Sequence, residues 1–148
     1  MPTRPTLTLR LLTPLLLAVP LAGAPGGCAA PPVNLDRAGP AFPDGFPQAT
    51  QLDVQAFLAD NRLTLTNTTA RHIPPGRLWL NRWYSREFPG LAVAESIELP
   101  LAEFTDRFGA EFRGGGFFAT EKPDTLVQAQ VESGGELIGL VVVAAPED

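Results

Sequence analysis

Apolar and polar residues alternate along much of the chain after residue 50. Residues 51–58 (QLDVQAFL) follow this two-residue period, and so do residues 62–69 (RLTLTNTT). Such a period is typical of a β-strand that buries one of its faces. The polar residues 59–61 between the two segments indicate a turn, so together the segments predict a β-hairpin.

Five further segments predict strands, and glycine, proline or polar residues separate them. They are residues 77–85 (RLWLNRWYS), 94–101 (AESIELPL), 115–120 (GGFFAT), 124–132 (DTLVQAQVE) and 136–145 (ELIGLVVVAA). The last segment is almost continuously apolar, which predicts a central strand covered on both faces. Only residues 101–112 (LAEFTDRFGAEF) have a pattern that allows a helical turn.

About seven short strands with frequent turn signals predict an all-β fold in residues 51–148. The architecture expected is a single small β-sandwich that is similar to immunoglobulin-like domains. The Cys…Trp…Cys spacing of true immunoglobulin domains is absent because Cys28 is the only cysteine of the chain. The similarity is therefore architectural, and a small β-barrel is the alternative.

The first 27 residues have the three parts of a secretory signal peptide. Residues 1–10 contain two arginines and no acid, residues 11–19 (LLTPLLLAV) are mostly apolar, and small residues follow. The apolar run is much shorter than the roughly 20 residues that a membrane-spanning helix needs. The pattern therefore predicts export and excludes a transmembrane helix in this segment.

Residues 25–28 (PGGC) resemble the lipobox of bacterial lipoproteins, with Pro25 where that family usually has leucine. The resemblance implies cleavage before Cys28 and attachment of a diacylglyceryl group to its sulfur. Two or more acyl chains hold a protein firmly to a membrane. The body would then lie in the periplasm or on the cell surface, and the alternative is a secreted soluble protein.

Residues 28–50 are rich in proline and glycine and show no strand or helix period. This composition predicts a flexible tether of about 25 Å between the membrane and the body. Alternatively, Phe42 and Phe46 pack back onto the body.

From Cys28 onward the chain has nine Lys and Arg against sixteen Asp and Glu, a net charge of 9 − 16 = −7. This acidic balance argues against nucleic acid as a partner, so the lipid anchor is the expected membrane contact.

Trp79, Asn81 and Trp83 form the candidate binding face. In one extended strand these three side chains lie on the same side, and Leu78 and Leu80 lie on the other. If the leucines face the core, the row of tryptophans is suited to stacking on sugar rings or to anchoring a protein partner. The alternative is a central strand whose second face is covered by the phenylalanines of the tether.

Residues with catalytic or metal-binding chemistry are few, and we expect no cofactor and no metal. His72 is the only histidine, and its surroundings (TARHIPPG) indicate an exposed loop.

The first functional hypothesis is a non-enzymatic envelope lipoprotein whose β-domain binds or scaffolds a protein or glycan partner. The second is a carbohydrate-binding module that uses the candidate face, and the third is a small hydrolase that uses Glu103 and Asp106.

Overall fold

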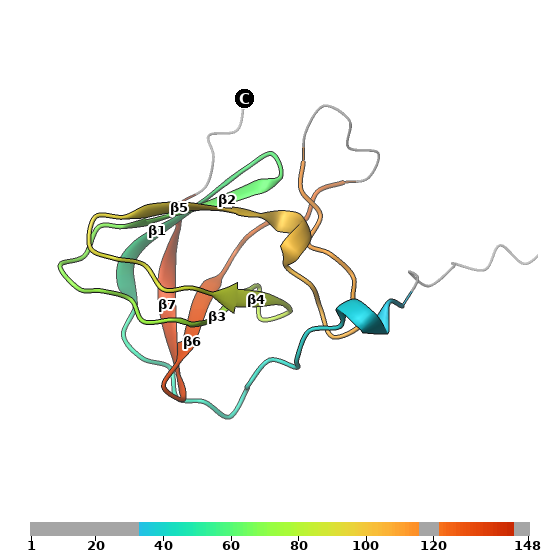
Figure 1. The fold of residues 1–148 in the computed structure, drawn as a ribbon, viewed down its shortest axis with the longest axis horizontal. Coiled ribbons are helices and arrows are strands. Elements are labelled where there is room, and N and C mark those ends of the chain that lie inside the picture. The colour runs from blue at the N-terminus through green and yellow to red at the C-terminus, as the bar shows by residue number, and fades with distance from the viewer. Residues whose placement is uncertain (1–32, 116–121, 144–148) are drawn as a thin grey trace, which may run out of the picture. The chain divides into compact units, whose positions relative to one another are not determined.

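The computed structural model describes residues 33–115 and 122–143 (Figure 1). These residues are almost entirely strand, turn and loop, so the expected all-β class is confirmed. The elements are η1 (Leu35–Arg37), β1 (Leu52–Ala59), β2 (Arg62–Asn67), β3 (Gly76–Leu80), β4 (Tyr84–Phe88), β5 (Ser96–Pro100), η2 (Leu101–Glu103), β6 (Ala129–Ser133) and β7 (Glu136–Val143).

The strands form one curled mixed sheet in the order β4-β3-β6-β7-β1-β2-β5. The β1–β7 pair is parallel and every other pair is antiparallel. A single curled sheet matches the barrel alternative, and the expected immunoglobulin-like sandwich is not confirmed.

The long strand β7 joins the two halves of the sheet. Its first part pairs with β6, ending at Gly139 opposite Gln130, and its second part pairs with β1 from Leu140 onward. A strand that exchanges neighbours along its length turns a corner between two sets of strands. The central position expected for this strand is correct, but complete burial is wrong, because Val141 and Val142 are partly exposed.

The core lies on the concave side of this curl. Alternate residues of the strands point into it, as the two-residue period requires. Phe104 and Phe112 join the core from the chain that follows η2. The strand residues of the core include Val54, Ala56, Leu63, Leu65, Leu78, Leu80, Leu99, Ala129, Val131 and Leu140.

The chain around Thr105 closes one edge of the sheet. The backbone of Thr105 exchanges two hydrogen bonds with Ser85 of β4, 2.9 and 3.1 Å long. A further backbone bond of 2.9 Å joins Phe112 to Phe104, which folds this chain into a compact loop against β4. The loop satisfies part of a strand edge that would otherwise be open to pairing with another chain.

Residues 33–50 lie against the body, which corrects the expected tether over this range. The backbone N–H groups of Asn34 and Gly39 donate to the carbonyls of Phe108 and Asp106, at 2.9 and 2.7 Å. Farther along, the N–H of Ala49 donates to the carbonyl of Leu137 in β7 at 2.7 Å. Backbone pairing compensates here for the low apolar content that predicted a free spacer.

Several sequence expectations fall outside the described residues. These are the signal peptide of residues 1–27, the lipidation site at Cys28 and most of the expected strand at residues 115–120. Within the described part of the chain, no helix is long and apolar enough to cross a membrane.

Candidate functional site

The segment expected to be one strand, residues 77–85, forms two strands and a turn. β3 ends at Leu80 and β4 begins at Tyr84. Asn81 and Arg82 both have positive φ, 53° and 58°, and the N–H of Trp83 donates to the carbonyl of Leu80 at 3.0 Å. Because the chain reverses here, the predicted row of Trp79, Asn81 and Trp83 does not form.

Trp79 is buried, with only 1% of its surface exposed. Its indole N–H donates to the carboxylate of Glu132 at 2.8 Å, and the ring of Phe42 packs edge-on against it with centroids 5.1 Å apart. The covered-face alternative is therefore confirmed for Phe42. Phe46, the other expected cover, is 37% exposed.

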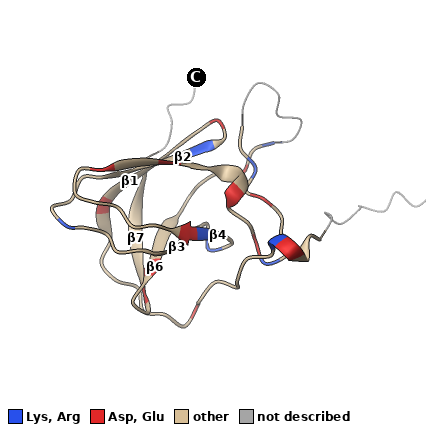
Figure 2. Ribbon diagram, in the orientation of Figure 1, with Lys and Arg blue, Asp and Glu red and all other residues tan. Residues whose placement is uncertain are grey.

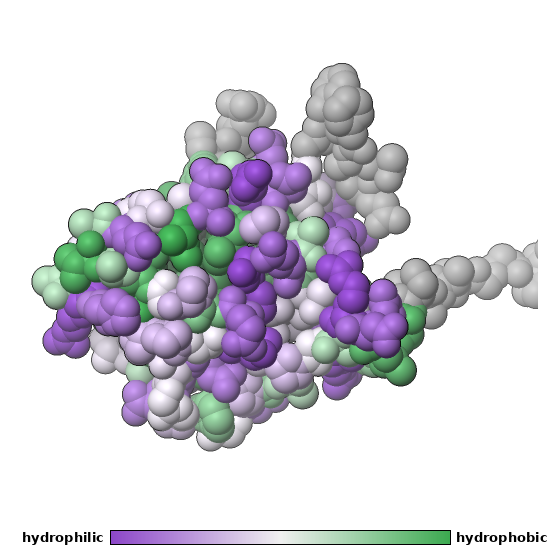
Figure 3. Space-filling model, in the orientation of Figure 1, coloured by the Kyte–Doolittle hydropathy of each residue, from purple (hydrophilic) through white to green (hydrophobic). Residues whose placement is uncertain are grey.

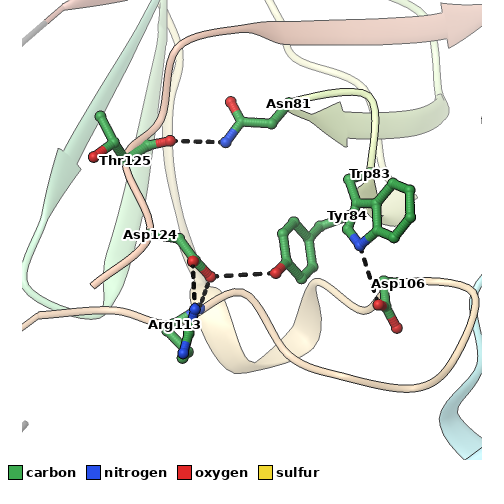
Figure 4. Close-up of polar contacts among 7 residues, drawn as sticks. All are labelled: Asn81, Trp83, Tyr84, Asp106, Arg113, Asp124 and Thr125. Atoms are coloured by element: carbon green, nitrogen blue, oxygen red, sulfur yellow. Dashed lines mark hydrogen bonds and ion pairs between the residues drawn. The ribbon is translucent and has the colours of Figure 1, made fainter. Parts of the chain in front are cut away.

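Asn81 uses its side chain to hold the chain that precedes β6 (Figure 4). Its amide nitrogen donates to the carbonyl of Thr125 at 2.7 Å, and its oxygen accepts the N–H groups of Val127 and Gln128 at 2.9 and 3.2 Å. These bonds occupy the amide in a structural role. Of the three candidate residues, only Trp83, which is 45% exposed, remains available to a partner.

Trp83, Arg107 and Phe108 form an exposed cluster that we term the aromatic–arginine surface. The ring centroids of Trp83 and Phe108 are 6.4 Å apart. The guanidinium carbon of Arg107 lies 5.2 Å from the Trp83 centroid and 4.8 Å from that of Phe108. The cation–π geometry of both contacts holds the charge of Arg107 at the surface of two aromatic rings.

Asp106 is only 5% exposed and accepts hydrogen bonds from two residues of this surface, Trp83 and Phe108. One carboxylate oxygen accepts the indole N–H of Trp83 at 3.1 Å, as Figure 4 shows, and the other accepts the N–H groups of Phe108 and Ala110, both at 2.8 Å. Three donors thus occupy a carboxylate that the hydrolase hypothesis requires. The second carboxylate of that hypothesis, on the exposed Glu103, pairs with Arg86.

Beside the aromatic–arginine surface lies a pocket of about 260 Å³. Arg82 contributes to it and pairs with Asp44, while its guanidinium carbon lies 4.7 Å from the centroid of Phe42. The lining residues are Pro40, Ala41, Phe42, Asp44, Arg82, Trp83 and Arg107. The N-terminal segment and the β3–β4 turn therefore build the pocket together.

Arg107 differs from most arginines of the described chain because no carboxylate pairs with it. Among the eight arginines in residues 33–115 and 122–143, only Arg71 shares this property. The other six, which have carboxylate partners, are Arg37, Arg62, Arg77, Arg82, Arg86 and Arg113. Figure 2 shows acidic and basic residues interspersed along the chain, and in this acidic protein an unpaired arginine is an exception.

Tyr84, Arg113 and Asp124 form a second polar cluster (Figure 4). Asp124 accepts the Tyr84 hydroxyl at 3.3 Å and the side chain and backbone N–H of Arg113 at 3.0 Å each. Burial raises the pKa of Tyr84, and the charge of Asp124 adds to the shift. Burial alone would raise the pKa of Asp124, but the hydrogen bonds and charge of Arg113 lower it below the ordinary value.

Between β6 and β7 there is a second, more open depression, of about 520 Å³. It lies where β7 leaves β6 to pair with β1, and no charged side chain lines it. The lining residues are Gln51, Val127, Gln128, Ala129, Gln130, Gly139, Leu140, Val141 and Val142. Its polar side chains are the amides of Gln51, Gln128 and Gln130.

Groups with metal-binding chemistry do not gather in the described ranges. Across residues 33–115 and 122–143, no three His, Cys, Asp or Glu side chains are placed to hold a metal ion together. His72 lies exposed in a loop, as expected.

Sequence reasoning identified Trp83 but missed Arg107 and Phe108 as its partners. Both residues precede Gly109 in the one segment whose pattern allows a helical turn, and its charged residues also fit a solvated loop with local ion pairs. The sequence feature that could have indicated these partners is an arginine and a phenylalanine directly before a glycine, in a stretch with no strand period. Comparison with known proteins adds no analogy: no family model, curated protein or solved structure matches the chain.

Proposed function

We propose that the protein is a non-enzymatic lipoprotein of the bacterial cell envelope, anchored by acyl chains on Cys28. Its β-domain binds another envelope component through the aromatic–arginine surface of Trp83, Arg107 and Phe108. The anchor is inferred from the leader and the PGGC sequence that ends at Cys28. The binding role is inferred from the exposed side chains of the described body.

The observation that carries the binding role is Arg107, whose guanidinium contacts two neighbouring exposed rings, Trp83 and Phe108, and makes no ion pair with a described carboxylate. Tryptophan and arginine are the residues most enriched among those that dominate binding energy at interfaces. Phe108 is 42% exposed beside them, so the surface presents apolar area and a positive charge together. The engagement of Asp106 and Glu103 in other contacts supports binding rather than hydrolysis.

Two measurements test this proposal. Mass spectrometry of the mature chain should find a diacylglyceryl group on an N-terminal Cys28, and an unmodified thiol would refute the anchor. Purified envelope lipids, polysaccharides and membrane proteins should then be titrated separately while tryptophan emission is recorded. We expect one fraction to shift the emission of Trp83 in wild-type protein and in Arg71→Ala, and to do so much less in Arg107→Ala.

Arg71 is the matched control because, in the part of the chain that the structure describes, it is the other exposed arginine without a carboxylate partner. An equal response of both variants would show that the charge of Arg107 contributes nothing specific. If no fraction shifts the emission, the binding role is refuted even if Cys28 is acylated.

A further inference from the structure

We propose that the component bound by the aromatic–arginine surface is the phospholipid headgroup layer of the membrane that holds the anchor. This inference rests on the proposed acylation of Cys28. Its consequence is that the body lies on the membrane surface, whereas the sequence predicted a body held about 25 Å away by a free tether.

The first argument is the short chain between the anchor and the body. Only residues 29–32 separate Cys28 from Val33, the first described residue. Five Cα-to-Cα steps span at most about 18 Å when fully extended. The next residue, Asn34, is bonded to the body through the carbonyl of Phe108. Phe108 of the aromatic–arginine surface therefore lies beside the first described residues after the anchor.

The second argument is the apolar character of this end of the body. Val33 and Leu35 are 60% and 72% exposed, and they flank Asn34, whose backbone N–H donates to the carbonyl of the exposed Phe108. In Figure 3 a small apolar area borders mostly hydrophilic residues at the end of the body that carries η1 in Figure 1, and larger apolar areas lie elsewhere on this face. Tryptophan is enriched at the headgroup level of membranes. The ring of Trp83 is 45% exposed for such contact, and its N–H is already bonded to Asp106.

The third argument is charge. The pocket beside this surface is lined by Arg82, Arg107 and Asp44, and Arg82 pairs with Asp44. The carboxylate of Asp106 lies beneath Trp83, so the four groups sum to 2 − 2 = 0, and Arg107 is the cation of this surface that makes no ion pair with a described carboxylate. The mature chain as a whole carries −7, so most of its surface is not attracted to anionic lipids. Phosphate accepts two parallel hydrogen bonds from a guanidinium. Among the described residues no carboxylate forms an ion pair with Arg107 and competes for it.

The test uses the acylated full chain, purified from membranes and reconstituted into vesicles of phosphatidylethanolamine and phosphatidylglycerol with or without brominated acyl chains. Trp79→Phe leaves Trp83 as the only tryptophan, and Trp83→Phe leaves the buried Trp79. Bromine should lower the emission of Trp83 about twofold, as expected for an indole at the headgroup level. The emission of Trp79 should not change. If Trp79→Phe does not fold, subtracting the Trp83→Phe signal from wild type gives the same quantity.

Two further variants test the contribution of charge. Arg107→Ala should reduce the quenching of Trp83, and Arg71→Ala should leave it unchanged. The inference is overturned if an acylated, vesicle-bound chain shows equal Trp83 emission with and without bromine. It is also overturned if Trp83 stays open to acrylamide on vesicles and responds instead to an envelope polysaccharide or protein, which would leave the proposed function intact. An unmodified Cys28 in the mass spectrum overturns the anchor and this inference together.

Discussion

The indole N–H of Trp83 donates a hydrogen bond of 3.1 Å to the buried carboxylate of Asp106. The two residues come from different parts of the chain, Trp83 from the β3–β4 turn and Asp106 from the loop that closes the edge of β4. The other carboxylate oxygen of Asp106 accepts the backbone N–H groups of Phe108 and Ala110. One side chain therefore orients the exposed tryptophan and shapes the loop that carries its partners.

Replacing Asp106 by alanine should lower the free energy of unfolding by about 2–4 kcal/mol, because three donors in a nearly buried site lose their acceptor. Urea unfolding followed by circular dichroism measures this loss. Glu98→Ala is the control, since Glu98 makes an exposed ion pair with Arg62 and should change stability by less than about 1 kcal/mol. Equal losses in both variants would contradict the supporting role of Asp106.

Asn67 organises the connections at the end of β2 and is 1% exposed. Its amide nitrogen donates to the carbonyls of Arg71 and Ala92 at 2.7 and 2.9 Å, and its oxygen accepts the N–H and hydroxyl of Thr69 at 3.0 and 2.7 Å. Because these partners would be left unpaired, Asn67→Ala should cost about 2–4 kcal/mol of unfolding free energy.

Two variants control the Asn67 measurement. Asn61→Ala removes an exposed amide from the β1–β2 turn and should change stability by no more than about 0.5 kcal/mol. Asn67→Asp keeps the size of the side chain but turns an oxygen toward carbonyl oxygens, so it should also be destabilising near neutral pH. A fully stable Asn67→Asp protein would show that the donated hydrogen bonds are unimportant.

The all-β class follows from residue patterns that are local. The two-residue periods of residues 51–58 and 62–69 became β1 and β2, with Leu63 and Leu65 buried as the period requires. The joining of all strands into one curled sheet was not predictable. It depends on the parallel pairing of β1 with β7, whose partners are far apart in sequence.

The candidate site was predicted less well because its decisive features are also non-local. Residues 77–85 contain no glycine or proline, so the turn at Asn81 and Arg82 carries only the weak signal that asparagine tolerates positive φ. Proline and glycine in residues 33–50 predicted a free spacer, but backbone bonds to Phe108, Asp106 and Leu137 hold this range. Backbone hydrogen bonds of this kind do not depend on side-chain identity, so the sequence pattern could not predict them.

Acid should destabilise the protein partly through Asp124. Its folded-state pKa lies below the unfolded value of about 3.9, so the unfolded chain takes up the proton first. The stabilisation is present above about pH 4 and is lost as the pH falls through the folded-state pKa. Urea unfolding across this range should show a weaker loss of stability in Asp124→Asn than in wild type. Identical pH profiles would contradict the assignment.

Alkali should act on the same cluster through Tyr84. Its folded-state pKa is raised, so the stabilisation is complete below the unfolded value of about 10 and is lost as the pH rises through the folded-state pKa. Tyr84→Phe should flatten this part of the stability profile. Absorbance of the phenolate can follow the ionisation directly, because Tyr84 is the only tyrosine of the chain. Ionisation at the ordinary pKa in the folded protein would contradict the prediction.

The contact between Gly109 and Asn34 offers a way to separate the N-terminal segment from the body. Gly109 has φ of 81°, and a Cβ on it would lie 1.9 Å from the carbonyl oxygen of Asn34. Gly109→Ala should therefore displace this segment and lower the free energy of unfolding by about 1–3 kcal/mol, combining backbone strain with the clash.

Gly134 provides the matched control for Gly109. It also has positive φ, 60°, but a Cβ there meets nothing within 4 Å, so Gly134→Ala should show the backbone strain alone, about 1 kcal/mol. Limited proteolysis should cut residues 33–40 faster in Gly109→Ala than in Gly134→Ala, because only the former disturbs the bond from Asn34 to Phe108. Cleavage at equal rates would show that this segment is not held through Gly109, and the short-chain argument for membrane contact would then lose its structural basis.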